Sequence, residues 1–322
     1  MILSLMKPPY HITSEILSLI ASISEKIGEI NAALLYKPTT ELRKKNRIKT
    51  IQSSLEIEGN TLTEEQITAL LENKRVVAPQ KDILEVQNAI KTYEQLHQFN
   101  PYQIKDLERA HSILMNGLIE SAGKLRTTNV GIVKGSKVEH IAPGGGMVKA
   151  LVKDLFGYLK KDKDLLLIKS CVFHYEFEFI HPFIDGNGRM GRLWQTLILM
   201  QRYPVFEFLP VESLIKQQQS IYYSKLSESD KKGNSTPFIE FMLGIIQAAL
   251  EEVLQLQNKT LYTEDRILLF KDKAGKNTFT RKDYLNHFKN ISAPTASRDL
   301  KWAVEQGILS RFGDKRLAEY QF

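Results

Sequence analysis

A dense run of charge and glycine interrupts an apolar, helical part of this chain. Residues 173–199 read FHYEFEFIHPFIDGNGRMGRLWQTLIL, and the central HPFIDGNGRMGR contains a histidine, an acid, three glycines and two arginines. Apolar residues at helical spacing flank it on both sides. The stretch therefore predicts two buried helices that are joined by a polar connection at residues 181–192.

The composition indicates a globular protein whose partners are anionic. The chain has 322 residues, 43% of them apolar, and its 44 Lys and Arg exceed its 37 Asp and Glu to give a net charge of +7. This charge favours partners such as a nucleotide or a nucleic acid. Without a signal peptide or an apolar run of about 18 residues, no membrane association is expected. The single cysteine, Cys171, cannot form an internal disulfide, which suits a reducing cytoplasm, and it is predicted to be inert core packing.

Helical periodicity dominates the first 256 residues, so the predicted fold class is all-α. The sequence Thr63 to Gln66 has capping-box spacing at the start of one of these helices. Residues 126–148 are instead rich in glycine and β-branched residues, and this composition predicts a short strand or hairpin. Clear helical segments before this point are 15–34, 63–73, 82–99 and 103–119.

The last sixty residues have the order helix, helix, turn, helix and two short strands, which is typical of a winged helix-turn-helix. We therefore predict three regions: an N-terminal helical region at 1–95, a core at 96–256 and a small winged-helix domain at 262–322. Thr295, Arg298 and Lys301 recur at helical spacing in the presumed recognition helix and could contact nucleic acid. Nearby acids, such as Asp299 and Glu305, dilute this charge, so the alternative is a module that contacts protein.

The glycine loop in the motif predicts an anion site. Gly186, Asn187 and Gly188 would expose backbone N–H groups at the start of a helix, where the helix dipole also favours negative charge. Arg189 and Arg192 are three residues apart, so they share a helix face, and two guanidinium groups suit a polyphosphate.

Two further side chains in the motif could serve phosphate chemistry. Asp185 precedes the loop, and a lone carboxylate beside phosphates is typical of a Mg²⁺ ligand. His181 could act as a neutral base that takes a proton from an attacking hydroxyl. The plain alternative is a glycine-rich turn whose histidine caps a helix, but the five features together favour a site.

The whole motif resembles the signature of Fic-domain proteins, His-Pro-Phe-x-Asp/Glu-Gly-Asn-Gly-Arg-x-x-Arg, at every defined position. The similarity extends more loosely over residues 10–250. The resemblance implies a Fic-type helical bundle that transfers AMP from ATP to a Ser, Thr or Tyr hydroxyl of a protein. His181 would deprotonate that hydroxyl and Asp185 would hold Mg²⁺. The nucleotide-binding residues implied are Gly186, Asn187, Gly188, Arg189, Met190, Gly191 and Arg192.

A second segment, SSLEIEGN at 53–60, resembles the family's inhibitory motif, Ser/Thr-x-x-x-Glu-Gly/Asn, in its N-terminal arrangement. Ser54 and Glu58 are one helical turn apart, and Gly59 follows as a helix stop. The resemblance implies that Glu58 pairs with Arg192 and takes the place of the γ-phosphate. The alternative is an ordinary surface helix end.

Two supporting regions follow from the same resemblance. Tyr222 and Tyr223 are similar to a tyrosine pair near the adenine, although tyrosines on a helix are otherwise usually core. Asp230 stands where the family often has an asparagine, which puts that contact in doubt. The hairpin would be a flap that pairs with the backbone of a target protein, or a hairpin without function; the residues concerned are Val138, Glu139, His140 and Ile141.

The leading hypothesis is thus an auto-inhibited protein adenylyltransferase that uses ATP and Mg²⁺, labels itself, and can also remove AMP. Transfer of another phosphate-containing group is less well supported, because both arginines expect a triphosphate tail. The alternative from another class is a DNA-binding regulator whose helical domain only senses nucleotide. Homodimers are common among similar proteins, while the sequence leaves the oligomeric state open.

Overall fold

The computed structural model of the chain describes residues 7–32, 40–134, 137–258, 263–275, 277–288, 291–313 and 318–322. The chain forms two compact units, Met1–Glu252 and Val253–Phe322. The boundary between the two units therefore lies inside the last long helix of the first. Across the described residues, no helix has both the length and the apolar character needed to span a bilayer.

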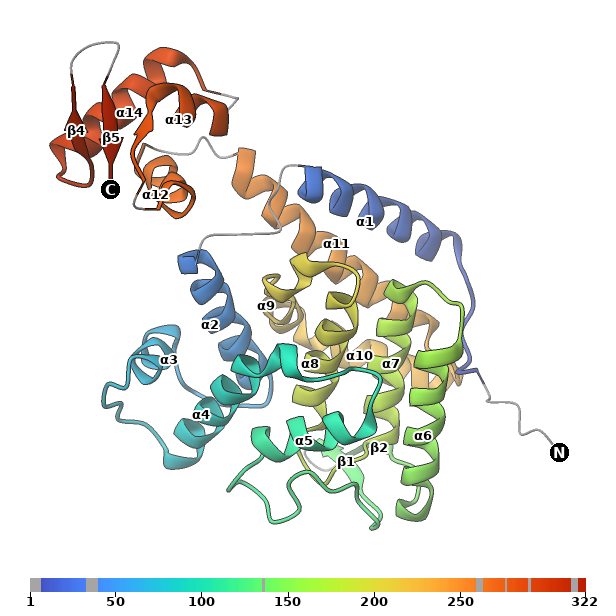
Figure 1. Cartoon of the computed structure of the whole chain (residues 1–322). Helices are drawn as coiled ribbons and strands as arrows, with labels where there is room; N and C mark the ends of the chain where they lie inside the picture. Colours follow the sequence, from blue (N-terminus) through green and yellow to red (C-terminus); the bar gives the residue numbers. More distant parts are fainter. Residues whose placement is uncertain are drawn as a thin grey trace. The chain divides into compact units, whose positions relative to one another are not determined.

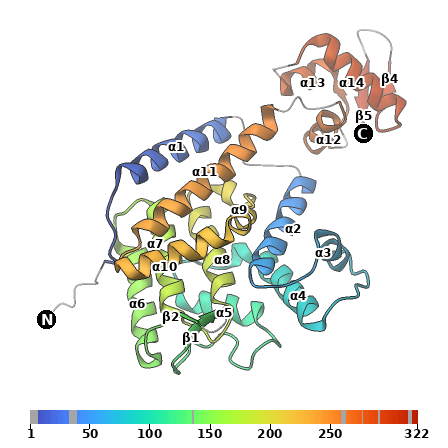
Figure 2. The same cartoon turned by 180° about the vertical axis from the view of Figure 1, so that it is seen from behind.

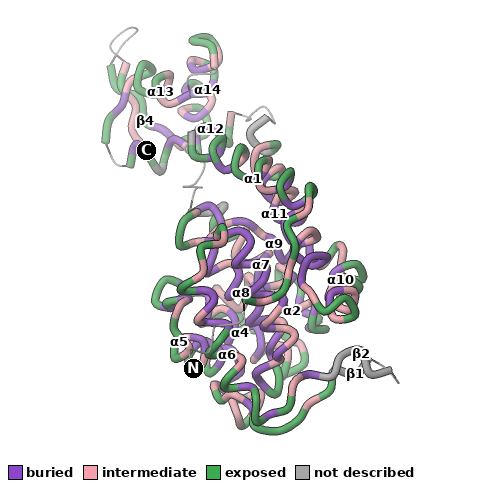
Figure 3. Tube along the Cα trace, turned by 90° about the vertical axis from the view of Figure 1, so that its right-hand side faces the viewer, coloured by how far each residue is buried: buried purple, intermediate pink, exposed green. Residues whose placement is uncertain are grey.

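The first unit is a bundle of helices with one small hairpin, in the all-α class that the periodicity predicted (Figure 1). Its centre is the pair α7 (Leu166–Ile180) and α8 (Asn187–Met200), and most of both helices is buried (Figure 3). The surrounding helices are α1 (Ser14–Ala32), α2 (Thr40–Ile57), α3 (Glu64–Leu71), α4 (Gln80–Glu94), α5 (Ile104–Leu114), α6 (Gly145–Lys161), α9 (Val211–Gln217), α10 (Gln219–Lys232) and α11 (Thr236–Asn258), with 3₁₀ turns at Leu96–Gln98 and Pro204–Glu207.

The central pair forms because apolar residues occur on every side of α7, which is typical of a helix in the middle of a domain. Cys171 and Phe173 on α7 and Trp194 on α8 are fully buried. Burial raises the pKa of the Cys171 thiol to about 12, in keeping with an inert core cysteine. Helix α7 stops at Ile180, because Pro182 disfavours helical backbone at the residue before it.

Two segments from the start of the chain pack on this core. Helix α1 lies alongside α11 in both views (Figures 1 and 2), and Lys26 forms an ion pair with Glu251 at 3.1 Å. Helix α2 packs against α9, where the hydroxyls of Ser53 and Ser213 lie 3.1 Å apart. Gly59 follows the end of α2. Its φ of +93° is a backbone conformation that only glycine adopts easily.

Local signals in the sequence match the structure where they are strongest. The capping box at the start of α3 is confirmed, with Thr63 and Gln66 each bonding the backbone of the other. The predicted hairpin is present as β1 (Gly131–Lys134) and β2 (Lys137–Ile141), which pair antiparallel. The register shifts between Ile132 and Val133, so β2 contains one extra residue, a β-bulge.

The second unit contains three helices, α12 (Thr263–Ala274), α13 (Arg281–His287) and α14 (Ala293–Glu305). A three-stranded sheet with the order β3-β5-β4 accompanies them, formed by β3 (Phe279–Thr280), β4 (Ser310–Phe312) and β5 (Glu319–Gln321). The unit has its own apolar core around Phe270, Tyr284 and Leu300. The sequence missed β3, because two residues are too short for a detectable alternation.

Candidate functional site

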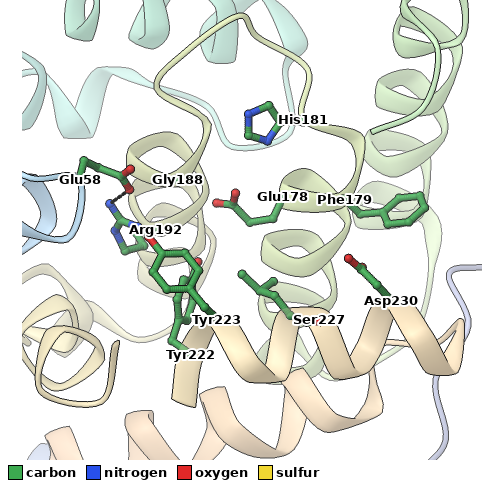
Figure 4. A pocket seen from close by; sticks show the side chains of 11 residues that line it. Glu58, Glu178, Phe179, His181, Gly188, Arg192, Tyr222, Tyr223, Ser227 and Asp230 are labelled. Atoms are coloured by element: carbon green, nitrogen blue, oxygen red, sulfur yellow. Dashed lines mark hydrogen bonds and ion pairs between the residues drawn. The ribbon is translucent and has the colours of Figure 1, made fainter. Parts of the chain in front are cut away.

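His181 is the residue at which α7 ends, and its backbone is left-handed. Its φ and ψ are 49° and 62°, and its N–H donates to the carbonyl of Phe177 at 3.0 Å. This conformation costs a non-glycine residue about 1–2 kcal/mol, so neighbouring contacts must hold it. The turn places the imidazole on the wall of a pocket (Figure 4).

The loop that follows is closed by the side chain of Asn187. Its Oδ1 accepts from the N–H of Phe183 and its Nδ2 donates to the carbonyl of the same residue, both at 2.9 Å. Gly186 is left-handed at φ +82°, and an added Cβ would lie 2.7 Å from the sulfur of Met115. The first N–H groups of α8 have no partner within the helix, so this closed loop presents them to an anion.

His111, on α5, packs against the loop, and no sequence pattern had singled it out. Its ring stacks on Phe183 with centroids 3.6 Å apart. The N–H of Gly123 donates to Nδ1 at 2.8 Å, which leaves Nε2 to donate to the carbonyl of Asp185 at 2.9 Å. This pair of contacts requires the neutral ring, and burial lowers the pKa of His111 to about 4.

Arg192, on α8, is 2% exposed and is held by α2. Its Nη2 lies 2.8 Å from Oε1 of Glu58 and donates to the carbonyl of Ser54 at 2.9 Å, and its Nε donates to the Ser54 hydroxyl at 3.2 Å. Burial alone would lower the pKa of Arg192, but the Glu58 carboxylate outweighs this effect and raises it. The ion pair that the resemblance implied is thus present between residues 134 positions apart.

The carboxylate of Glu58 lies directly against the glycine loop. A Cβ placed on Gly188 would collide with Oε1 of Glu58 and would lie 3.1 Å from Nη1 of Arg192. Gly188 is the second residue of α8, so Glu58 brings negative charge to the helix N-terminus where a bound anion would lie. The glycine at this position is required for the approach of an acidic group.

Arg189 has a different set of neighbours. Its Nη1 lies 3.3 Å from Glu85, and its Nη2 lies 3.5 Å from the carboxylate of Asp185. The Asp185 side chain is 54% exposed and accepts from the N–H of Gly186 at 2.6 Å. No cluster of three metal-binding side chains occurs among the described residues. A single accessible carboxylate fits Mg²⁺, which takes one or two protein carboxylates and completes its shell with phosphate and water.

One face of α10 forms the opposite wall of the pocket. Figure 4 shows Tyr222, Tyr223, Ser227 and Asp230 along this helix, facing Glu58 and Arg192 at one end and Phe179 at the other. Tyr222 is buried, and its hydroxyl lies 3.0 Å from Nε2 of His174. His174 is fully buried as a packing residue, and burial lowers its pKa to about 3.

Known proteins share both sequence and structure with this chain. The profile of the Fic/DOC family matches residues 101–199. The crystal structure of a Fic family protein from Desulfovibrio desulfuricans G20 is 39% identical in sequence, covers 98% of both chains and superposes with a TM-score of 0.77. The chain belongs to the Fic family.

Curated Fic proteins extend this comparison. The protein adenylyltransferase Fic of Nematostella vectensis is 30% identical over 251 residues, and that of Drosophila grimshawi is 32% identical over 237. These matches cover 71% and 70% of this chain but 55% and 45% of the relatives, so the chain spans about half their length. Fic-1 of C. elegans, at 20% identity and a TM-score of 0.62, shares the fold.

Two positions that the Fic signature assigned to the nucleotide have packing roles. The side chain of Met190 is fully buried. A Cβ on Gly191 would lie 2.8 Å from Glu178 and 2.9 Å from His174, so this glycine lets α8 approach α7 closely. We therefore expect the nucleotide to be contacted by the backbone of residues 186–188 and by the side chains of Arg189 and Arg192.

Asp230 is the position at which the resemblance implied an asparagine. Its Oδ1 accepts from the hydroxyl of Tyr175 at 2.9 Å, and the residue lines the far end of the pocket. Burial and the charge of Asp230 raise the pKa of the neighbouring Glu176 to about 7. This end of the pocket is therefore more acidic than an asparagine would make it.

The flap residues belong to the hairpin, and the C-terminal residues belong to the second unit. Val138, Glu139, His140 and Ile141 form β2, whose backbone is described while their side chains are not. Thr295, Arg298 and Lys301 all lie on α14 in the second unit.

Three residues close to the connection between α7 and α8 were not predicted from the sequence: His111, Glu85 and Glu178. Glu178 had a local signal, because it lies one helical turn before His181. The other two are brought in from α4 and α5, and no spacing in the sequence links them to the motif.

Proposed function

We propose that the protein is an adenylyltransferase that transfers AMP from ATP to a hydroxyl of a protein, and that Glu58 inhibits it. The supporting observation is the position of the Glu58 carboxylate, which neutralises Arg192 and lies against Gly188 at the N-terminus of α8. An anion and this carboxylate would compete for the same arginine and the same helix end. The curated Fic relatives named protein adenylyltransferase support the reaction.

In this reaction the hydroxyl oxygen of the target bonds to the α-phosphorus of ATP. The bond from that phosphorus to the oxygen bridging to the β-phosphate breaks, and pyrophosphate leaves. His181 accepts the hydroxyl proton, and Arg189 and Arg192 hold the outer phosphates. Asp185 would hold Mg²⁺, which supplies positive charge next to the phosphates. With Glu58 in place the same residues could instead orient a water, which would remove AMP from a modified target.

The test uses ATP labelled with ³²P at either the α or the γ position, with the protein itself and a cell lysate as targets. Label should pass to protein from the α position only, in the presence of Mg²⁺. His181→Ala should lower the rate by roughly 10²–10⁴-fold, the range for loss of a general base, while ATP binding is kept. Exposed His97→Ala is the matched control. Transfer from the γ position would contradict the proposal.

A second candidate function concerns the C-terminal unit, which we propose to be a winged helix-turn-helix that binds DNA. Two of its acids are engaged within the unit: Asp299 is 1% exposed and forms a bidentate ion pair with Arg266, and Asp283 caps α13. Arg298 and Lys301 remain exposed on α14. Burial of Asp299 removes one of the two nearby acids from this surface, while exposed Glu305 lies 3.7 Å from the Lys301 ammonium.

Duplex DNA binding, measured by fluorescence anisotropy at several salt concentrations, tests this candidate. The paired change Arg298→Ala and Lys301→Ala should weaken binding and reduce its salt dependence, since each lost phosphate contact lowers the slope by about 0.9. Binding that is absent, or is unaffected by the two changes, would favour a protein partner for this unit.

A further inference from the structure

Arg126 is a buried arginine outside the motif that contacts the catalytic turn. It lies between α5 and β1 and is 3% exposed. Its guanidinium donates four hydrogen bonds, and every acceptor is a backbone carbonyl. These contacts do not include an acidic side chain. The buried guanidinium instead holds the backbone segments that supply the four carbonyls in fixed positions.

Two of these carbonyls flank the α-carbon of His181. Nη2 donates to the carbonyl of Ile180 at 2.9 Å, and Nε donates to the carbonyl of His181 at 2.6 Å. These oxygens belong to the peptide planes on either side of His181, so one guanidinium sets both backbone dihedrals of this left-handed residue. The backbone N–H of Arg126 also donates to the carbonyl of Pro182 at 2.9 Å.

The other two carbonyls lie at the base of the hairpin. Nη1 donates to Thr128 and Nη2 donates to Pro143, each at 2.7 Å. Thr128 precedes β1 and Pro143 follows β2, so the two oxygens mark both ends of the hairpin. The base is also tightly packed, because a Cβ on Gly145 would collide with the backbone of Thr127.

We propose that Arg126 is a positioning residue: it holds His181 in its left-handed conformation and fixes that conformation relative to the base of the β1–β2 hairpin. The kinetic part of this inference rests on the proposed AMP transfer. A target that pairs with the hairpin would then present its hydroxyl to an imidazole held by the same guanidinium. Lysine cannot replace it, because an ammonium lacks the planar fork that reaches four oxygens at once.

The first measurement is hydrogen exchange in Arg126→Lys, followed by mass spectrometry on the full chain. Peptides from 127–145 and from 178–187 should both exchange about tenfold faster, while peptides from α11 are unchanged. The matched control is Arg109→Lys, whose side chain is 46% exposed and donates to the carbonyl of Gln98. Unchanged exchange in either segment would overturn the proposal.

The second measurement is a double-mutant cycle between Arg126→Lys and His181→Ala, with Glu58→Gly present throughout to remove the inhibitory carboxylate. Arg126→Lys should lower AMP transfer about 10²-fold, the cost of a small misplacement. The ATP dissociation constant should stay within twofold. With His181→Ala present, Arg126→Lys should have no further effect, because the side chain that it positions is absent. An equal fall in both backgrounds would show a merely structural role and overturn the proposal.

The two measurements separate this inference from the proposed function. If Glu58→Gly alone transfers no AMP, the proposed function fails, and exchange still decides whether Arg126 holds both segments. If Arg126→Lys does not fold, Arg126→Gln replaces it, since an amide offers two N–H donors and carries no charge to bury.

Discussion

At the scale of single residues, Arg192 has a second acidic neighbour besides Glu58. Glu212 on α9 is 2% exposed and shares a small cavity with Arg192 and Gln195. Burial raises the pKa of Glu212 to about 7 from its ordinary value near 4.5, although the charge of Arg192 acts in the opposite direction. Of the two acids, Glu58 is the one whose carboxylate contacts the guanidinium of Arg192, at 2.8 Å.

This raised pKa predicts a stability difference that depends on pH. Between pH 4.5 and 7 the folded protein keeps the proton on Glu212 and the unfolded chain does not. The free energy of unfolding therefore falls by about 1.4 kcal/mol for each unit by which the pH rises. Glu212→Gln removes this dependence and should gain about 3 kcal/mol relative to wild type across that range. Denaturant unfolding at several pH values measures it. A difference between the two proteins that stays constant with pH would show that Glu212 is ionised in the fold.

At the scale of elements, the connection between α7 and α8 depends on the loop closure by Asn187. Asn187→Ala would remove both bonds to Phe183 and leave a buried N–H and a buried carbonyl without these partners. The free energy of unfolding should fall by about 2 kcal/mol, at roughly 1 kcal/mol per hydrogen bond. ATP affinity should fall as well, because the N-terminus of α8 would lose its fixed position.

Calorimetric titration and denaturant unfolding together test this prediction. Asn46→Ala, which removes a side-chain bond to the carbonyl of Phe208 elsewhere in the unit, is the matched control. Unchanged ATP affinity in a destabilised Asn187→Ala protein would show that the loop does not need this closure to bind phosphate.

Some parts of this site could be predicted from the sequence because their signals are local. The capping box of α3, the end of α7 before Pro182 and the glycine stop after α2 each depend on a few adjacent residues. The pair Glu58–Arg192 spans 134 positions and was reached only through the resemblance to a family. Arg126 and His111 were missed, because their partners at residues 180–185 lie 54 to 74 positions away and are set by packing that periodicity does not encode.

At the scale of the whole molecule, the described residues that line the pocket, Glu58 among them, belong to the first unit, and the second unit has a core of its own. Deletion of residues 262–322 should therefore leave self-labelling with AMP within about twofold of the full chain, since separate domains fold on their own cores. Circular dichroism confirms that the truncated protein is folded. Loss of labelling in a folded truncation would show that the second unit contributes to the site.

The inhibitory contact between Glu58 and Arg192 is the central claim of this account, and one labelling series tests it most directly. AMP incorporation from α-labelled ATP is measured over a range of ATP concentrations in wild type, Glu58→Gly, Arg192→Ala and the double variant. Glu56→Gly, at a half-buried position on the same helix, is the matched control. Glu58→Gly should label at least tenfold faster than wild type, because the freed Arg192 can hold the phosphates in line with the attacking hydroxyl. The double variant should lose this gain. A folded Glu58→Gly protein that labels no faster than wild type at any ATP concentration would contradict the claim.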